Sequence, residues 1–150
     1  QKGNLFREKK DYKKALINYE KSNKINPNAK SYNNIGLIKE EILNDLNGAL
    51  IAFNQAIELD QKLAISFSNR ARIKTKLGDL EGAKSDLNKS IEIDSSNYDL
   101  YFNRAQFFFH EENDIDKYCS DLDKASRLGD KEAKVLINEN CNKESKQDRQ

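Results

Sequence analysis

The sequence predicts an all-α protein built from a repeated pair of helices. Four aspartates recur at intervals of 34, 34 and 35 residues, and an apolar residue follows three of them directly while Tyr follows the first. They are Asp11, Asp45, Asp79 and Asp114. Between them the apolar residues step by three or four positions, which is the spacing of one face of a helix. With one Pro and six Gly in 150 residues, little interrupts such helices.

Each aspartate marks the start of the second helix of a pair. Asp is a favoured N-cap residue, and it stands just ahead of the apolar run in every copy. Four positions later comes a residue at the expected helix crossing, which is Ala in three copies and Tyr in the fourth: Ala15, Ala49, Ala83 and Tyr118. The expected helices cover residues 1–9, 12–26, 30–43, 46–59, 63–77, 80–93, 97–112, 115–128 and 131–141.

These helices form about four hairpins and a C-terminal capping helix. We expect one domain over residues 1–141, with repeats at approximately 1–28, 29–62, 63–96 and 97–130, and the cap at 131–141. An array of repeats needs a terminal cap with a polar outer face to stay in solution. Residues 142–150 are a polar tail, which we expect to fray. The first copy lacks the opening turn of its first helix, so we expect a boundary or a processed N-terminus at residue 1.

The charge balance and the missing motifs argue against several classes of function. Lys and Arg number 26 and Asp and Glu 25, and a net charge of +1 is unlike that of a dedicated nucleic-acid-binding protein. No apolar run reaches about 18 residues, so membrane insertion is not expected. The sequence has one His, His110, and neither a glycine-rich phosphate loop nor a cluster with metal-ligand spacing. We therefore expect no enzyme, no cofactor and no metal.

The repeated columns resemble a known family. In the first copy, six residues follow its order: Gly3, Phe6, Tyr12, Ala15, Tyr19 and Pro27. They resemble the tetratricopeptide repeat, and the resemblance extends over roughly residues 1–128. It implies a right-handed αα superhelix in which the first helix of each pair lines a concave, protein-binding face. Later copies depart from the family pattern, because Pro27 is not repeated and Tyr118 stands where Ala is expected.

A row of asparagines is the first candidate for binding. In copies two to four an Asn stands two residues before the small residue of the first helix: Asn34, Asn69 and Asn103. A side-chain amide offers one acceptor and two donors, which match a peptide bond, so such a row can hold an extended backbone. The arrangement is similar to the asparagine ladder of the O-linked N-acetylglucosamine transferase repeats, and Asn4 would extend the groove. The alternative is that these amides are simply solvated.

The same face offers Arg72, Phe102, Gln106 and Phe109 as further peptide-binding candidates. Phe102 and Phe109 are expected to anchor a side chain of the ligand; the alternative is that the C-terminal helix or a neighbouring copy covers them. Some related repeats grip the C-terminal carboxylate of heat-shock chaperones with charged side chains. The sequence argues against that clamp, because Asn69 and Ile65 stand where an Arg and a Lys are required.

Two arginines recur at a column that the family normally gives to Leu. Arg70 and Arg104 directly follow two asparagines of the row, and Asp86 and Asp121 recur in the paired helices. We expect two ion pairs between helices, Arg70 with Asp86 and Arg104 with Asp121, which serve packing and not a site.

The only two cysteines, Cys119 and Cys141, are expected on the last repeat helix and at the end of the cap. A bridge would close a loop of about 22 residues, stabilise the fold by about 3 kcal/mol and imply an oxidising compartment such as the periplasm. The segment that starts at Cys119 resembles the C-terminal ending of many Bacteroidetes repeat proteins. The alternative is two unrelated thiols in a cytoplasmic protein. The compartment is therefore undecided, with the periplasm or cell envelope favoured if the two are bridged.

Together these features predict a non-catalytic protein–protein interaction module that binds an extended peptide or a partner protein on its concave face. The alternative is a structural or oligomerisation scaffold, for example in an assembly of the cell envelope, in which the chain pairs with copies of itself. A shared fold does not by itself distinguish the two.

Overall fold

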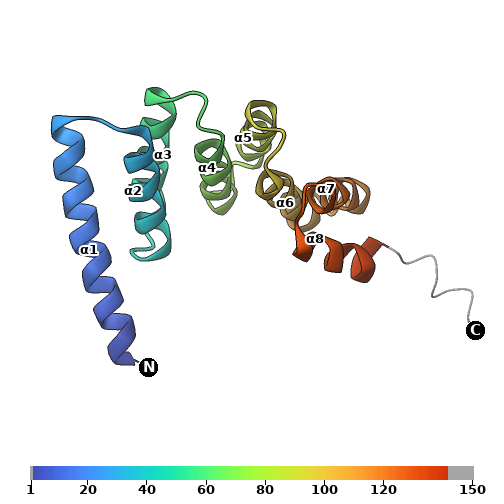
Figure 1. Cartoon of the computed structure of the whole chain (residues 1–150), viewed down its shortest axis with the longest axis horizontal. Helices are drawn as coiled ribbons and strands as arrows, with labels where there is room; N and C mark the ends of the chain where they lie inside the picture. The colour runs from blue at the N-terminus through green and yellow to red at the C-terminus, as the bar shows by residue number, and fades with distance from the viewer. Residues whose placement is uncertain (1, 142–150) are drawn as a thin grey trace, which may run out of the picture. The chain divides into compact units, whose positions relative to one another are not determined.

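The computed structural model describes residues 2–141, with side chains from residue 11 onward, and every regular element in this range is helical (Figure 1). The helices are α1 (Lys2–Ile25), α2 (Ala29–Glu41), α3 (Leu46–Leu59), α4 (Ala64–Lys76), α5 (Leu80–Ile93), α6 (Tyr98–Phe107), α7 (Ile115–Arg127) and α8 (Lys131–Leu136), with π-helical turns η1 (Phe108–Glu112) and η2 (Ile137–Cys141). The predicted all-α fold class is confirmed. The expected tail at 142–150 and the candidate side chain of Asn4 lie outside the described residues.

The helices group into two compact units, Gln1–Asp86 and Leu87–Gln150. Unit 1 contains α1 to α4 and the first half of α5. Unit 2 contains the second half of α5 and all later elements. The expectation of one domain over residues 1–141 stays a prediction. Among the described helices, none has the length and apolar character needed to cross a membrane.

Four chain reversals are made in the same way. The residue before a capping aspartate has a positive φ angle: Asn44 (53°), Gly78 (86°), Asn113 (51°) and Gly129 (111°). Gly and Asn adopt this left-handed conformation most readily. The next residue then caps the following helix by accepting a backbone N–H with its carboxylate: Asp45, Asp79, Asp114 and Asp130. These turns explain why the predicted boundaries of the later helices agree closely with the structure.

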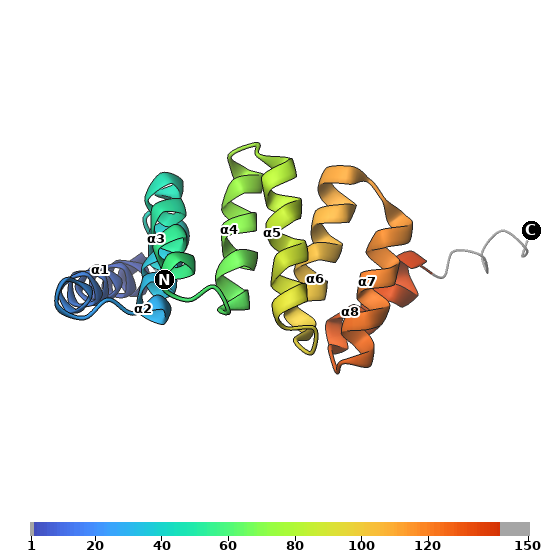
Figure 2. The ribbon, with the colours of Figure 1, turned by 90° about the horizontal axis from the view of Figure 1, so that it is seen from above.

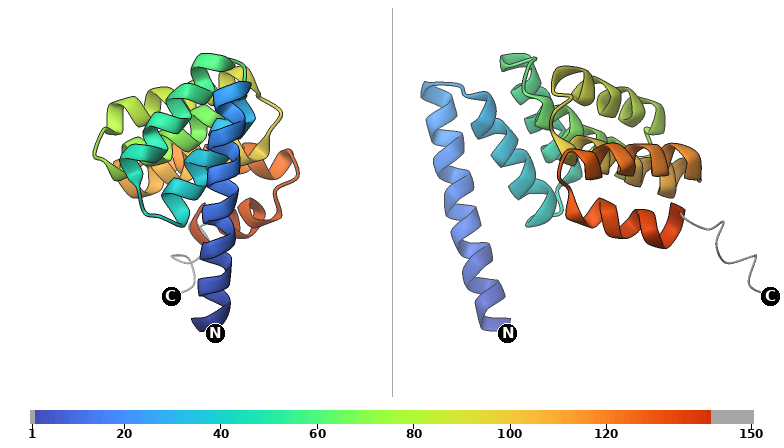
Figure 3. Two further views of the ribbon diagram at one scale, coloured as in Figure 1. Left: turned by 90° about the vertical axis from the view of Figure 1, so that its left-hand side faces the viewer. Right: turned by 45° about the vertical axis from the view of Figure 1, so that its right-hand side comes forward.

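The first copy does not make this turn, and the prediction of separate helices at 1–9 and 12–26 is wrong. Residues 2–9 and 12–25 all belong to α1, one continuous helix of 24 residues. The residue before Asp11 is Lys10, and a side chain with Cβ incurs a penalty of about 1–2 kcal/mol in the left-handed conformation. With no Gly or Asn at this position, the helix continues. The N-terminal half of α1 runs past the turn between α2 and α3 (Figures 1 and 3).

The core of unit 1 is centred on the close crossing of α2 and α3. Ala49 and Phe53 of α3 and Ile73 of α4 form its cluster of fully buried side chains. Gly36 of α2 faces the Phe53 ring, and a Cβ atom added there would lie 2.5 Å from a ring carbon. Gly36 is therefore small because the aromatic side chain needs the space.

In unit 2 the hairpin is formed by α6, η1 and α7, which lie side by side in Figure 2. Leu100, Ala105, Leu122 and Ala125 are fully buried in it, and Ala133 of α8 is buried at the cap. This copy has one residue more before its capping aspartate than the third copy, and η1 takes it up. The N–H of Asp114 reaches back six residues to the carbonyl of Phe108, whereas that of Asp79 reaches back five to Lys74.

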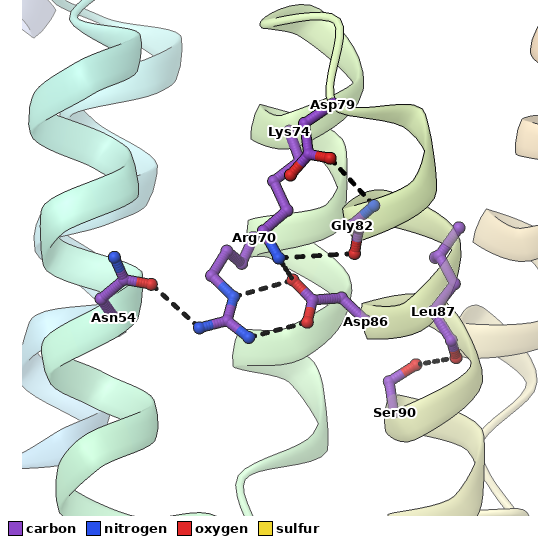
Figure 4. A network of polar contacts seen from close by, with 8 residues as sticks. All are labelled: Asn54, Arg70, Lys74, Asp79, Gly82, Asp86, Leu87 and Ser90. Carbon is purple, nitrogen blue, oxygen red and sulfur yellow. Dashed lines mark hydrogen bonds and ion pairs between the residues drawn. The ribbon is translucent and has the colours of Figure 1, made fainter.

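A buried carboxylate joins the helices of the α4/α5 hairpin (Figure 4). Arg70 donates to both oxygens of Asp86 at 2.7 Å, and Lys74 lies 3.0 Å from the same carboxylate. Arg70 also donates to Oδ1 of Asn54 in α3 at 2.9 Å. One guanidinium therefore holds two helices of its hairpin together and links them to the preceding helix.

The same arrangement recurs in unit 2. Arg104 donates to both oxygens of Asp121 at 2.8 Å and to Oδ1 of Asn88 in α5 at 2.8 Å. Hydrogen bonding to Asp121 raises the pKa of Arg104 above its ordinary value, although burial opposes the shift. Both ion pairs expected from the recurring columns are present. Each arginine also bonds an Asn of the preceding helix.

A disulfide attaches the cap. Cys119 of α7 is bonded to Cys141 at the end of η2, 22 residues further along the chain. Asn140 also donates to the hydroxyl of Tyr118 at 3.3 Å. The bridge fixes the end of the cap to the last repeat helix.

Removing the buried carboxylate should destabilise the protein. We expect Asp86→Ala to lower the free energy of unfolding by about 2–3 kcal/mol, because Arg70 and Lys74 lose a buried partner. Urea unfolding followed by circular dichroism measures this. The matched control is Asp123→Ala, which breaks the exposed Arg127–Asp123 pair and should cost less than about 1 kcal/mol. Equal losses for the two variants would contradict the structural role of Asp86.

Reduction of the disulfide should loosen the cap. Because a loop of this size restricts the unfolded chain, we expect Cys119→Ser with Cys141→Ser to lose about 3 kcal/mol. Urea unfolding of the oxidised, reduced and double-variant proteins provides the comparison. Thiol titration of the native oxidised protein should find no reactive cysteine, and two reactive thiols would show that the bridge is absent in solution.

Candidate functional site

The first helices of the second and third copies, α2 and α4, meet through a buried amide cluster. Oδ1 of Asn33 accepts hydrogen bonds from Ser66 Oγ and from Asn69 Nδ2, both at 3.0 Å. Asn69 is 6% exposed. One donor of this predicted ligand-binding amide is therefore used within the protein, where it aligns α4 on α2.

A second polar contact joins the same two helices one to two turns further on. Glu40 of α2 has a side chain that is 2% exposed, and it accepts from Arg72 at 2.6 Å and from Lys76 at 2.7 Å. Arg72 and Lys76 remain 44% and 49% exposed. The buried carboxylate therefore holds two cationic side chains at the surface, and Arg72 lies 3.8 Å from Glu41 as well.

Asn34 lies on a different part of unit 1, beside a pocket of about 380 Å³ between α1 and α2. Its Nδ2 donates to the hydroxyl of Tyr19 at 3.5 Å, and the residue is exposed. The pocket is lined by Tyr12, Ala15, Tyr19, Asn34, Leu37, Ile38, Glu41 and Ile42. Asn34 can therefore offer its amide to a ligand at the edge of a mainly apolar hollow.

In unit 2 the candidates lie on α6 and η1. Asn103 is exposed, whereas Phe102, Gln106 and Phe109 are half-buried. The Phe109 ring packs on Tyr118 with centroids 4.8 Å apart and on His110 with centroids 5.1 Å apart. Tyr118, the residue at the position where Ala was expected, thus supports Phe109 from behind and leaves part of its ring accessible.

The predicted row of asparagines therefore divides into members in different environments. Asn34 is at the pocket, Asn69 is in the buried cluster with Asn33, and Asn103 is on the exposed side of α6. The asparagine row and the peptide-binding role of Arg72, Phe102, Gln106 and Phe109 stay predictions.

Sequence reasoning missed the partners that fix these residues. Asn33 and Glu40 were not recognised as acceptors between repeats, nor were Asn54 and Asn88 as partners of the two arginines. A signal exists for the last pair, because Asn54 and Asn88 stand 34 residues apart and so occupy one column. Glu40 shows no comparable recurrence, and its partners Arg72 and Lys76 belong to the next copy.

Across the described residues, no group of three or more His, Cys, Asp or Glu side chains could hold a metal ion. His110 contacts Phe109, and both cysteines are in the disulfide. The candidate residues on the first helices offer amide donors and acceptors, cations and aromatic rings.

Comparison with known proteins agrees with this geometry. The family profile of the tetratricopeptide repeat matches residues 1–28, 29–63 and 64–97. A search of the curated proteins finds no significant match. The matched windows end at residue 97, so the fourth pair, α6 and α7, is identified from the structure.

Solved structures with the same fold include three of low sequence identity. The crystal structure of MamA has a TM-score of 0.69 and 18% identity, over 82% of this chain and 71% of that one. The Arabidopsis OM64 TPR domain has a TM-score of 0.65 and 23% identity, over 74% and 92%. The first TPR of Spaghetti (RPAP3), bound to HSP90 peptide SRMEEVD, has a TM-score of 0.65 and 18% identity, over 75% and 90%.

The three matched windows cover more than half of the chain, and the hairpins α2/α3 and α4/α5 coincide with the second and third windows. This protein belongs to the tetratricopeptide repeat family.

Proposed function

We propose that this protein binds an extended peptide or a partner protein through the first helices of its repeats and catalyses no reaction. The repeats make it a protein–protein interaction module, and the likeness to a repeat domain bound to a peptide supports this reading. The observation that carries the proposal is that buried partners fix accessible side chains in place: Glu40 holds the half-exposed Arg72 and Lys76, and Tyr118 supports the half-buried Phe109.

In unit 1 the proposed contacts are an amide and two cations. Asn34 offers a donor and an acceptor to a peptide bond of the ligand. Arg72 and Lys76 are half exposed above Glu40, so an acidic ligand side chain can approach them from solvent. We assign Asn69 a supporting role, because it is buried and bonded to Asn33.

In unit 2 the proposed contacts are one amide and an aromatic anchor. Asn103 is exposed on α6, and Gln106 is half-buried one turn further along. Phe102 and Phe109 provide apolar area for a ligand side chain, with Tyr118 supporting the Phe109 ring. A rigid, preformed surface binds with a smaller ordering cost than a flexible one, and the Arg104 network behind α6 supplies that rigidity.

The Cys119–Cys141 bridge favours an oxidising compartment, since such bonds rarely persist in the cytosol. We therefore propose the periplasm or another extracytoplasmic site.

A second candidate function is a scaffold that associates with itself. It is favoured by a specific observation, the open pocket between α1 and α2, whose lining is mainly apolar. A pocket of this kind is a site for a further helix as readily as for an extended peptide.

Peptide capture should depend on the exposed amides. We expect the double variant Asn34→Ala, Asn103→Ala to bind peptides selected from a random display library at least about tenfold more weakly, since each amide is expected to contribute about 1 kcal/mol. Fluorescence polarisation with the selected peptides measures the affinity. The matched control is Asn47→Ala, which removes an exposed amide from the second helix α3. Equal affinity of the wild type and the double variant would remove these amides from the proposed site.

The chaperone-type carboxylate clamp should be absent. We expect the peptide SRMEEVD to bind more weakly than 1 mM, because Ile65 and the buried Asn69 replace charged donors of the clamp. Isothermal titration calorimetry with this peptide and with its C-terminal amide shows whether binding depends on the terminal carboxylate. Micromolar binding that is lost on amidation would show that a clamp is present after all.

A further inference from the structure

The pocket between α1 and α2 lies where the repeat pattern predicts the first helix of the first copy. In α3, Ala49 and Phe53 are completely buried, whereas the residues of the same columns in α1, Ala15 and Tyr19, are half-buried. Tyr12 at the end of the pocket is 43% exposed. The difference arises because α3 is covered by the first helix of its own repeat, whereas none of the described helices covers α1 in this way.

The chain itself carries the segment that fits this place. In the second repeat, Gly36 of α2 approaches the Phe53 ring, and two residues later Ile38 is buried. In the third repeat, Ala71 and Ile73 occupy these columns with no exposed surface. The corresponding residues of the first copy are Gly3 and Leu5. Residues 2–9 therefore have the small and apolar residues, at the correct spacing, for covering Ala15 and Tyr19.

Residues 2–9 cannot cover these residues within their own molecule while α1 is continuous. At a rise of about 1.5 Å per residue, Gly3 and Tyr19 lie about 24 Å apart along one straight helix. The pocket is lined from Tyr12 onward, and the N-terminal half of α1 runs beyond the turn between α2 and α3 (Figures 1 and 3). Because the chain makes no turn at Lys10, residues 2–9 and the pocket that they would cover stay apart within one molecule.

We propose that the occupant of the pocket is residues 2–9 of a second copy of this chain, in a reciprocal exchange. In a hairpin the first helix lies antiparallel to the second, so two α1 helices crossing antiparallel reproduce the same contacts between molecules. Asp11 is midway between Gly3 and Tyr19, which places the two-fold axis there and sets Gly3 of each copy against Tyr19 of the other. Exchange of an identical element is a low-cost route to a dimer, because the contacts are those of the closed fold.

Charge near the axis opposes the association at low salt. Lys9, Lys10, Lys13 and Lys14 flank Asp11, so two cationic stretches meet at the crossing. Salt screens such repulsion, and at about 1 M the Debye length falls to about 3 Å. The dimer should therefore tighten as the salt concentration rises.

The experiment is sedimentation equilibrium of the whole chain over a wide concentration range, at low salt and at about 1 M salt. We expect a monomer–dimer equilibrium for the wild type. In Lys10→Gly, the position gains the residue that makes the turns at Gly78 and Gly129, so residues 2–9 can fold back onto their own pocket. The dimer dissociation constant of this variant should rise at least about tenfold, since the left-handed penalty is removed from the monomer.

Two further variants keep the test decisive. Lys13→Gly introduces the same residue into the part of α1 that is helical in both forms, and at about 1 M salt, where the charge is screened, its dissociation constant should equal that of the wild type within about twofold. Ala15→Arg places a long charged side chain at the closest approach and should abolish the dimer, with circular dichroism confirming that the helices are intact. None of these residues belongs to the proposed peptide-binding set.

A wild type that stays monomeric throughout, or a dimer that neither Lys10→Gly nor Ala15→Arg weakens, would overturn the proposal. A dimer that weakens with salt would also contradict it, because the cationic crossing predicts the opposite. Loss of peptide binding in the Asn34, Asn103 variant with an unchanged dimer would leave this inference intact, so the two proposals can fail independently.

Discussion

The fold depends on the conformation of one residue in each repeat, the residue that precedes the capping aspartate. In this structure the turn between the two helices of one repeat uses a left-handed residue, which Gly and Asn provide at little cost. Where they stand, at Asn44, Gly78, Asn113 and Gly129, the chain reverses and the next Asp starts a helix. Where Lys stands, at residue 10, the helix runs on. The number of closed hairpins therefore follows from backbone sterics at single positions and not from the apolar columns.

Buried polar groups then determine how neighbouring helices align. Asn33 and Glu40 accept from the next copy, and Arg70 and Arg104 bridge their own hairpins while reaching an Asn of the preceding helix. Such groups are costly to bury unless they are paired. Each pair therefore favours the one alignment of the two helices in which both partners meet. The same contacts fix the side chains in front of them. Arg72 is held from below by Glu40, and the Phe109 ring is supported by Tyr118.

The candidate site was only partly accessible to sequence reasoning. Recurrence identified the arginine–aspartate pairs, because both partners of each pair repeat with the period of the helices. It also identified the row of Asn34, Asn69 and Asn103, but one column in the sequence became three environments in space. Asn69 is buried because Asn33 stands opposite it, and no repeat rule places Asn33 there. The extra residue of the fourth copy was visible as well, yet only the structure shows that a π-helical turn absorbs it.

By itself, the sequence determined the helical content, the period of the repeat, the capping aspartates of the second to fourth copies and the faces that become buried there. These follow from spacing along one chain and from the propensities of single residues. The tertiary structure decided which helices close into hairpins, which amides and cations are used internally, and where an apolar surface is left uncovered. Those outcomes depend on contacts between residues far apart in the chain and on small differences in backbone energy at the turns. Lys10 is the clearest case: a difference of about 1–2 kcal/mol at one residue separates a closed first hairpin from a single long helix beside an open pocket.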